Sequence, residues 1–443
     1  HEKNTSAWRY PSDRESQEVK QFMAASGVKN IIYIDDRSAL ETDIAITGNG
    51  LDLTSEFAQA DGGLILDERV KNENQTVVAQ SQLNRQTRKD QVIELGTRVF
   101  FKHYNLLLQN AESGSTSAVV NDEGSTVLFS AFGQYKTSDS KKLSFQCGLN
   151  FLHFRLNRQS LMEPRASVRY RIMPNSSFGL SYGLHSRTER LNYYLNRDER
   201  NVQQNRNLKL TRSHHFVGTF THQFNEQLHL RLEPYYQYLF DVPVLAGTAF
   251  SFINLENDWF ISERLTNTGK GRNFGLDVTL ERFMNNGYYY MLTSSVFRSR
   301  YRGGDHIWRS TAFDRGFILN GLIGKEWFIG TSSSNVLGLN LRATYQGGQR
   351  YIPFDTDASL AAREIVLNEA DAFAAQLDAT LITHFTFSYR KNKTKSSSVW
   401  TLSLINATMV EEFEGFAYNQ QTDQIDQLGE ALIIPNISYK LEF

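Results

Sequence analysis

The sequence predicts an all-β protein, an antiparallel transmembrane β-barrel with about 16–18 strands in this chain. Segments of about ten residues alternate between apolar and polar side chains, as a barrel with one lipid face and one lumen face requires. Several of these segments reach roughly ten to fifteen residues, longer than ordinary strands. Their connections alternate between long and short, which is typical of outer-membrane barrels and not of sandwiches.

Residues 1–26 are charged and irregular, and residues 27–443 are predicted to form the barrel. Residues 27–87 predict two to four strands, among them 30–35 and 76–83. Fourteen strands are predicted from about residue 90 onward, over 90–109, 125–137, 141–157, 163–173, 177–186, 210–224, 227–240, 273–283, 288–301, 315–328, 336–347, 374–390, 398–408 and 431–443.

The connections between these strands fall into two groups. Short turns are predicted near 138–140, 174–176, 225–226, 284–287, 330–335 and 391–397. Long loops are predicted near 110–124, 187–209, 241–272, 302–314, 348–373 and 409–430, with one brief exception at 158–162. Long loops are expected outside the cell and short turns in the periplasm.

Alternation within the strands predicts which side chains face lipid. One parity carries Leu276, Val278, Leu280, Leu339, Leu341, Leu381 and Phe385, which are expected to point to lipid. The other parity carries Asp277, Glu281, Arg342 and Asp378, which are expected to face the lumen. The chain holds 12% aromatic but only 40% hydrophobic residues. This combination suits a polar interior and an aromatic-rich exterior.

The last segment, 431–443, ends in a strand with Tyr439, Leu441 and Phe443 on one face. A closed barrel has no free edge, so this last strand is expected to pair with the first. Phe443 is then expected in the aromatic girdle at the inner interface. A terminal Phe on such a strand also resembles the signal that the bacterial barrel-assembly machinery reads.

Composition and motifs argue against several function classes. Charge is balanced, with 47 Lys+Arg against 48 Asp+Glu, which disfavours nucleic-acid binding. Cys147 is the single cysteine, so neither an internal disulfide nor a thiolate cluster is expected. His215 and His222 point to opposite faces of one predicted strand, so they are not expected to share a metal ion. Catalytic and phosphate-binding motifs are absent from the sequence, and the chain is expected to be no enzyme and to hold no cofactor.

The long loops carry the candidate ligand-binding residues, the aromatic side chains Tyr193, Tyr194, Trp259, Phe260 and Trp308. Large amphipathic rings bind sugars or chelates through their faces and edges, and binding residues concentrate on loops over a rigid scaffold. A second interpretation is that these rings pack the loops together or mark the outer girdle. The sequence favours neither interpretation.

Several stretches of the chain resemble one known family. They include "MEPRASVRYRI", "SFGLSYGLHSR", "LKLTRSHHFVGTFTHQF", "GKGRNFGLDVTLERF" and "DHIWRSTAFDRGFILNGLIGKEW". Together with the terminal Phe they resemble the C-terminal barrel of TonB-dependent outer-membrane receptors. The resemblance covers about residues 75–443 and is strongest for the type with a carboxypeptidase-regulatory-like N-terminal domain.

The resemblance implies a 22-stranded barrel in the bacterial outer membrane, with a plug inside it and a TonB box. We find neither plug nor TonB box here, so the chain is expected to be the C-terminal portion of a receptor. The implied partners are outer-membrane lipid, a plug domain, TonB, the barrel-assembly machinery and a small solute such as a siderophore or an oligosaccharide. The alternatives are a passive outer-membrane porin and, less favoured, an outer-membrane enzyme.

Overall fold

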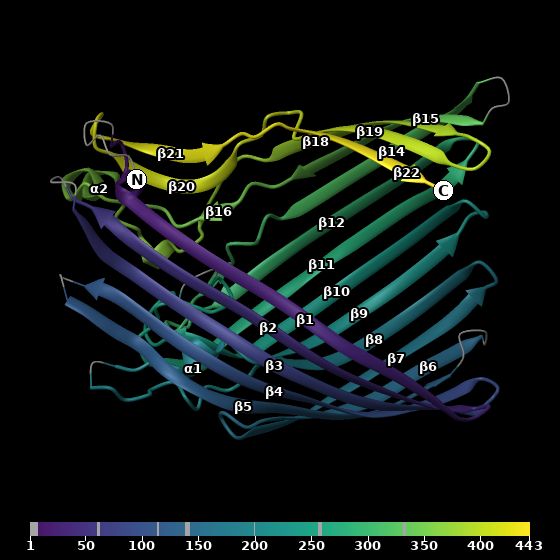
Figure 1. Ribbon diagram of the computed structural model, residues 1–443, viewed down its shortest axis with the longest axis horizontal. Helices are drawn as coiled ribbons and strands as arrows, with labels where there is room; N and C mark the ends of the chain where they lie inside the picture. The colour runs from purple at the N-terminus through teal and green to yellow at the C-terminus, as the bar shows by residue number, and fades with distance from the viewer. Residues whose placement is uncertain are drawn as a thin grey trace.

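The computed structural model describes residues 8–59, 63–112, 115–137, 142–198, 200–255, 259–330 and 334–443. Within these ranges, eighteen strands form one antiparallel sheet, which curls into a tilted wall (Figure 1). The predicted turn at 138–140 and part of the one at 330–335 lie outside the described residues. None of the described helices is long and apolar enough to cross a membrane.

Seventeen long strands build the wall, and a short strand, β13 (Trp308–Ser310), pairs with β12 inside a loop. The long strands are β1 (Glu15–Asp35), β2 (Ser38–Ala58), β3 (Leu64–Arg88), β4 (Gln91–Glu112), β5 (Ser115–Thr137), β6 (Leu143–Phe154), β7 (Gln159–Met173), β8 (Ser176–Arg187), β9 (Thr211–Gln223), β10 (Leu228–Leu245), β11 (Leu265–Asn285), β12 (Tyr288–Arg302), β14 (Phe317–Ile329), β15 (Asn335–Gln346), β18 (Thr380–Asn392), β19 (Ser397–Ile405) and β22 (Ile434–Glu442).

The remaining elements lie in the long connections. They are helix α1 (Leu191–Leu195), helix α2 (Thr356–Ala362), 3-10 turns at Pro11–Arg14 and Glu369–Asp371, the hairpin β16 (Arg350–Tyr351) with β17 (Ala375–Gln376), and the hairpin β20 (Glu412–Asn419) with β21 (Gln424–Glu430). All of these loop elements belong to connections predicted to be long, except the 3-10 turn at Pro11–Arg14 and β17, which lies in the predicted strand 374–390.

Each long strand pairs with the next along the chain, so β1 and β22 are the two edges of the wall. Seventeen antiparallel strands leave these edges running in the same direction, from the long-loop end to the short-turn end (Figure 1). The described residues show no backbone pairing between β1 and β22, so the predicted pairing of first and last strand is wrong. Direct antiparallel hydrogen bonding between them is excluded because their directions match.

At the long-loop end, the segment that precedes β1 contacts the β20–β21 hairpin, which precedes β22. There the backbone N–H of Gln420 donates to the carbonyl of Arg9 at 2.7 Å, and the Tyr10 hydroxyl donates to Asp426 at 2.8 Å. Toward the short-turn end the edges separate, and strands of the far wall are visible between them (Figure 1). Edge strand β1 is therefore exposed over nearly its whole length.

The two faces of the wall differ in chemistry as the alternation predicts. One face carries exposed apolar side chains, for example Val296, Leu339 and Phe385. The other carries hydrogen-bonded polar pairs, such as Ser295 donating to Asp277 at 2.6 Å and Thr344 donating to Asn320 at 2.7 Å. Loop side chains pack against this second face, so it is the inner one.

The apolar side chains of the outer face form a band along the wall, which we call the apolar band. Where a strand extends beyond this band, the inner face becomes apolar and the outer face becomes polar. On β4 the inner face carries the charged residues Glu94, Arg98 and Lys102 and then becomes apolar at Tyr104, Leu106 and Leu108, which are at most 5% exposed. The outer face changes in the opposite sense, from Phe101 to polar residues. Beyond the band the inner face must be buried against loops and the outer face meets water, so the reversal follows from the surroundings of the strand.

This reversal explains most of the strand boundaries that differ from prediction. Strand β1 begins at Glu15, not after residue 26, and the predicted loop 110–124 is the end of the β4–β5 hairpin, with Glu112 opposite Ser115. Both stretches are polar and lack the alternation of a lipid-facing strand, but neighbouring backbone supplies their hydrogen bonds. The predicted strand 374–390 is divided into β17 and β18, and Asp378 lies exposed between them.

The last strand presents its aromatic side chains on the outer face. Tyr439 packs against Trp400 of β19 with ring centroids 4.5 Å apart, at the short-turn end. Phe443 follows directly after β22 and is 96% exposed. Exposed rings at this end of the outer face match the position of an interfacial girdle.

Candidate ligand-binding surface of the long loops

The long connections gather at one end of the wall, where α1, α2, β16, β20 and β21 all lie (Figure 1). Their side chains form three structures that together shape this end. These are a buried loop core around α1, a polar cluster around Asp314, and a group of four aromatic rings. A rigid wall that holds adaptable loops is the usual arrangement for binding.

The loop core contains two of the predicted binding residues. Tyr193 is 3% exposed and packs edge-on against Phe252 at 4.8 Å, and Tyr194 is fully buried against Phe154 at 5.6 Å. The Tyr194 hydroxyl accepts a hydrogen bond from the backbone N–H of Glu189 at 3.2 Å. Neither ring is accessible to a solute in this structure, which favours the packing interpretation for both.

Buried asparagines tie this core to the neighbouring loop. Asn205, 1% exposed, donates to the carbonyl of Glu263 at 2.9 Å and accepts from the backbone N–H of Leu265 at 2.9 Å. Asn192 donates to the carbonyl of Trp259 at 3.2 Å. Because these buried amides pair with backbone groups, the β8–β9 and β10–β11 loops are fixed to each other.

The other three predicted aromatic residues are partly buried in different places. Trp259 and Phe260 pack on the edge of the loop core, and Arg190 lies over the Trp259 ring at 5.2 Å. Trp308 lies on β13, away from the core, with Arg272 over its ring at 4.5 Å. The structure therefore does not bring the five residues together into one site.

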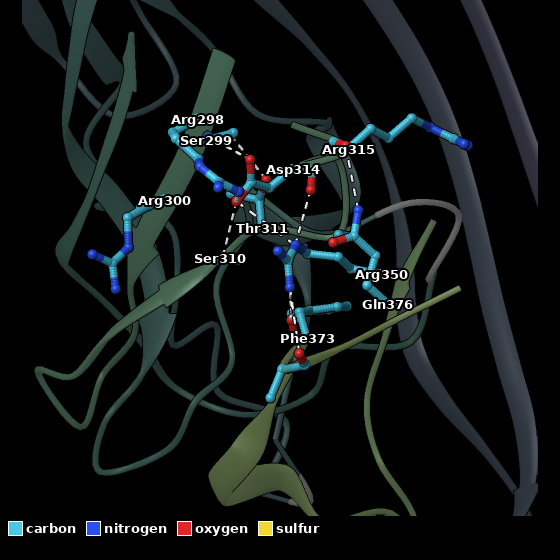
Figure 2. Close-up of polar contacts among 12 residues, drawn as sticks. Arg298, Ser299, Arg300, Ser310, Thr311, Asp314, Arg315, Arg350, Phe373 and Gln376 are labelled. Atoms are coloured by element: carbon cyan, nitrogen blue, oxygen red, sulfur yellow. Dashed lines mark hydrogen bonds and ion pairs between the residues drawn. The ribbon is translucent and has the colours of Figure 1, made fainter. Parts of the chain in front are cut away.

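The polar cluster is centred on Asp314, which is 1% exposed (Figure 2). Its carboxylate accepts from the backbone N–H of Ser299 at 3.1 Å and from the Ser310 hydroxyl at 2.9 Å. Arg350 lies 3.7 Å from the carboxylate and donates to the Asp314 carbonyl at 2.9 Å. Hydrogen bonds thus satisfy a charge that would otherwise be costly to bury.

Arg350 extends this cluster to a second loop. Its guanidinium also donates to the carbonyl of Phe373 at 3.3 Å, next to β17. Gln376 of β17 donates back to the carbonyl of Arg315 at 3.3 Å (Figure 2). The β12–β14 and β15–β18 loops are therefore joined by side chain to backbone hydrogen bonds.

A second arginine strengthens the same junction. Arg309, 9% exposed, donates to the carbonyl of Ala370 at 2.9 Å and forms an ion pair with Asp305 at 2.7 Å. Burial raises the pKa of Asp305, but the hydrogen bonds from Arg309 and from the Ile307 N–H outweigh burial and leave the pKa below its usual value. Asp305 is thus held in its charged form.

The aromatic group consists of Tyr351, Phe354, Phe413 and Phe416, which we call the aromatic quartet. Phe416 is at its centre, with ring centroids 5.0 Å from Tyr351, 4.9 Å from Phe354 and 5.3 Å from Phe413. All four rings are partly exposed. The sequence does not reveal this group because its members come from two loops separated by more than fifty residues.

The predicted lumen charges occupy different surroundings. Asp277 and Glu281 lie on the inner face of β11, and Arg342 lies opposite His384 on β15 and β18. Asp378 lies outside the strands. Within the described ranges, no three His, Cys, Asp or Glu side chains come close enough to share a metal ion.

Tyr194 gives the loop core a pH dependence that can be measured. Burial raises the pKa of its hydroxyl above the ordinary value of 10.0. A raised folded pKa adds stability that is present below pH 10 and is lost as the pH rises through the folded value. We expect a late phenolate step in the absorbance at 295 nm above pH 10, and Tyr194→Phe should remove it. A late step that persists unchanged in Tyr194→Phe would show that another tyrosine gives this step.

Comparison with known proteins finds similar solved structures but no match in sequence. No family model and no curated protein matches the sequence. Among solved structures, the ferric-catecholate import receptor Fiu of E. coli K12 matches 98% of this chain with a TM-score of 0.64 and 10% identity. The pyoverdine outer membrane receptor FpvA of Pseudomonas aeruginosa PAO1, bound to pyoverdine, matches 96% with a TM-score of 0.67 and 10% identity.

A third neighbour is the ferric yersiniabactin uptake receptor FyuA of Yersinia pestis, with a TM-score of 0.66, 10% identity and 96% of this chain matched. The chain spans 65%, 62% and 61% of the length of Fiu, FpvA and FyuA. At 10% identity these likenesses concern architecture. The chain therefore has the fold of the β-barrel wall of outer-membrane import receptors.

Proposed function

We propose that this chain is the barrel wall of a TonB-dependent receptor that imports a scarce solute through the bacterial outer membrane. The observation that carries the proposal is the wall itself, matched over 96–98% of the chain by import receptors. Its apolar outer face, polar inner face and one-sided long loops suit a membrane-embedded transporter. We infer a transporter and not an enzyme, because the described parts of the long loops bring together side chains that pack the loops and join them to one another.

The strand count is compatible with a larger barrel. Edges β1 and β22 run in the same direction, so antiparallel closure requires an odd number of further strands. A barrel of 22 strands exceeds the seventeen of this wall by five. A barrel of that width has a lumen large enough to hold a plug. The inner polar side chains, including Asp277, Glu281 and Arg342, are then available as its hydrogen-bond partners.

We infer that the first solute to test is an iron(III) chelate, since the structural neighbours bind or import such compounds. The aromatic quartet is the better candidate contact, because its rings are partly exposed at the long-loop end. Aromatic faces bind planar chelating groups and sugar faces alike, so an oligosaccharide remains the second substrate class. Trp259 and Phe260 flank the loop core and are proposed to support the loops that surround the ligand.

Uptake by the full-length protein should depend on TonB. Cells that carry the protein as their sole receptor should accumulate radiolabelled iron(III) chelate, and deletion of TonB should abolish accumulation. A passive porin needs no energy from the inner membrane, so uptake that persists without TonB would replace the importer by the porin. Uptake of a labelled oligosaccharide instead of the chelate would keep the importer and change its substrate.

The double change Phe413→Ala/Phe416→Ala tests the quartet in the same assay. It should weaken binding of the imported solute, while Phe313→Ala, which removes a 50% exposed loop ring outside the quartet, should not. The heat-resistant barrel band on a gel should be unchanged in both variants. Equal binding by both variants would remove the quartet from the ligand site.

A further inference from the structure

A group of basic side chains lies on the outer face of the wall, just beyond the apolar band at the long-loop end. On β11, Lys270 and Arg272 share one face with Phe274 and continue its alternation. On β12, Arg302 lies directly opposite Lys270, and Arg300 directly opposite Arg272. Residues directly opposite each other project to the same side of a sheet. We call Lys270, Arg272, Arg300 and Arg302 the basic cluster.

The opposite face of the same strands identifies this face as the outer one. A Cβ on Gly271 would meet the side chains of Ile253 and Leu239 at 2.6 and 3.2 Å, and Tyr301 is fully buried. That inner face is thus filled by loop side chains. The basic cluster projects the other way, and Arg300 points away from the Asp314 cluster (Figure 2).

The basic cluster is unfavourable for the sheet by itself. Like charges directly opposite each other, with Cβ atoms about 4.5–5.5 Å apart, destabilise a strand pair. None of the four cations forms an ion pair with a carboxylate that the structure describes. Nearby acids are engaged elsewhere, Asp241 by Arg212 and Asp305 by Arg309.

Two of the guanidinium groups also contain a buried donor atom without a hydrogen-bond partner. The Nε atoms of Arg272 and Arg302 are buried, and no described group accepts from them. Buried polar atoms without partners are rare and point to a ligand or water that supplies the acceptor. A multiply charged anion with several oxygens would satisfy both the charge and these donors.

Position along the strand indicates where this anion would come from. Arg272 and Lys270 lie about 7 and 13 Å beyond Phe274 along β11, at about 3.3 Å per residue. Lys270 lies over the ring of Tyr238 at 5.9 Å, next to an outward aromatic patch that includes Tyr182, Phe216 and Tyr236. Aromatic side chains of this kind mark the membrane interface. The basic cluster therefore lies at the level of lipid headgroups on the long-loop side.

We propose that the basic cluster binds the phosphate groups of the outer-leaflet glycolipid, lipopolysaccharide, on the outer surface of the wall. Arg guanidinium groups donate paired hydrogen bonds to phosphate oxygens, and each phosphate offsets the repulsion between facing cations. The Arg272 guanidinium lies over the Trp308 ring and the Lys270 ammonium over the Tyr238 ring, which positions both cations at the surface of the wall. The proposal rests on the outer-membrane location proposed above.

The test uses the full-length protein in nanodiscs of phosphatidylethanolamine, with lipopolysaccharide, enzymatically dephosphorylated lipopolysaccharide or phosphatidylglycerol added. Native mass spectrometry counts the bound lipid. Wild type should retain lipopolysaccharide, and Arg300→Gln/Arg302→Gln should weaken its retention by about tenfold for each arginine that no longer binds a phosphate. The control Lys325→Gln removes a cation on the outer face of β14 at the opposite end of the apolar band, where its ammonium lies over the Tyr288 ring, and should retain lipopolysaccharide as wild type does.

Each of the other possible outcomes refutes one part of the proposal. Equal retention of dephosphorylated lipopolysaccharide, or unchanged retention by the double variant, would refute the phosphate site. Tighter binding of phosphatidylglycerol would assign the site to phospholipid and refute the glycolipid. Failure of wild type to enter nanodiscs would instead refute the membrane location. The double variant should melt no lower than wild type without lipopolysaccharide, because it removes repulsion; a lower melting temperature would give the arginines a purely structural role.

Discussion

Replacing Val278 by Arg is expected to destabilise the folded barrel by about 2–4 kcal/mol. Val278 lies on the outer face of β11, in the middle of the run from Phe274 to Leu280, where a cation would face hydrocarbon. The neighbouring change Thr279→Arg points into the lumen, opposite Arg231 and Thr293 and near Glu281. It should cost no more than about 1 kcal/mol, the size of a cross-strand pair interaction, because the new cation faces Arg231 across the strand pair but stays in water.

The two variants form a matched pair, since they add the same side chain one residue apart on one strand. Folding of the full-length protein into lipid vesicles, titrated with urea and followed by tryptophan fluorescence, gives both free energies. Equal losses at 278 and 279 would mean that β11 has no lipid face. A larger loss at 279 would mean that the faces are assigned in reverse.

Asp314→Ala is expected to release the β12–β14 loop from the β15–β18 loop. The change removes the acceptor for Ser299 and Ser310 and leaves Arg350, whose side chain is 12% exposed, beside an empty space. Breaking a buried ion pair by removing one partner costs about 3–5 kcal/mol. The wall strands keep their own pairing, so the loss should appear as local opening of the loops and not as global unfolding.

Hydrogen exchange of the loop amides measures this opening. Residues 303–316 and 347–379 should lose protection together in Asp314→Ala, while β4 and β5 stay protected. A double-mutant cycle with Arg350→Ala isolates the coupling between the two side chains. A coupling energy near zero would show that Ser299, Ser310 and Arg298 hold Asp314 in place without Arg350.

Within the apolar band the wall is predictable from sequence. Strands such as β12 and β15 agree with their predicted ranges to within one residue at each end, because lipid on one side and water on the other impose strict alternation. Beyond the band this constraint ends. Glu15 and the tip of the β4–β5 hairpin lie in segments that the sequence predicts to be irregular, because their strand conformation comes from neighbouring backbone and not from their own pattern.

The loop structures are harder to predict for a different reason. Tyr193 and Tyr194 share a stretch of sequence, but what decides their role is burial against Phe252 and Phe154, which lie elsewhere in the chain. The aromatic quartet and the Asp314–Arg350 contact likewise join separate loops. Long-range contacts of this kind depend on how the wall places its loops, and local sequence carries no signal for them.

The shared direction of β1 and β22 has a consequence for how such a wall changes in evolution. Duplication or loss of a whole hairpin adds or removes two strands and leaves the directions of the two edge strands unchanged. Each added hairpin also brings one new loop to the long-loop end and one turn to the other end. Gain or loss of a single strand reverses the direction of every strand that follows it. The long loops and short turns of those strands then exchange ends of the wall. Long loops can therefore be gained one hairpin at a time, while the two edge strands keep their shared direction.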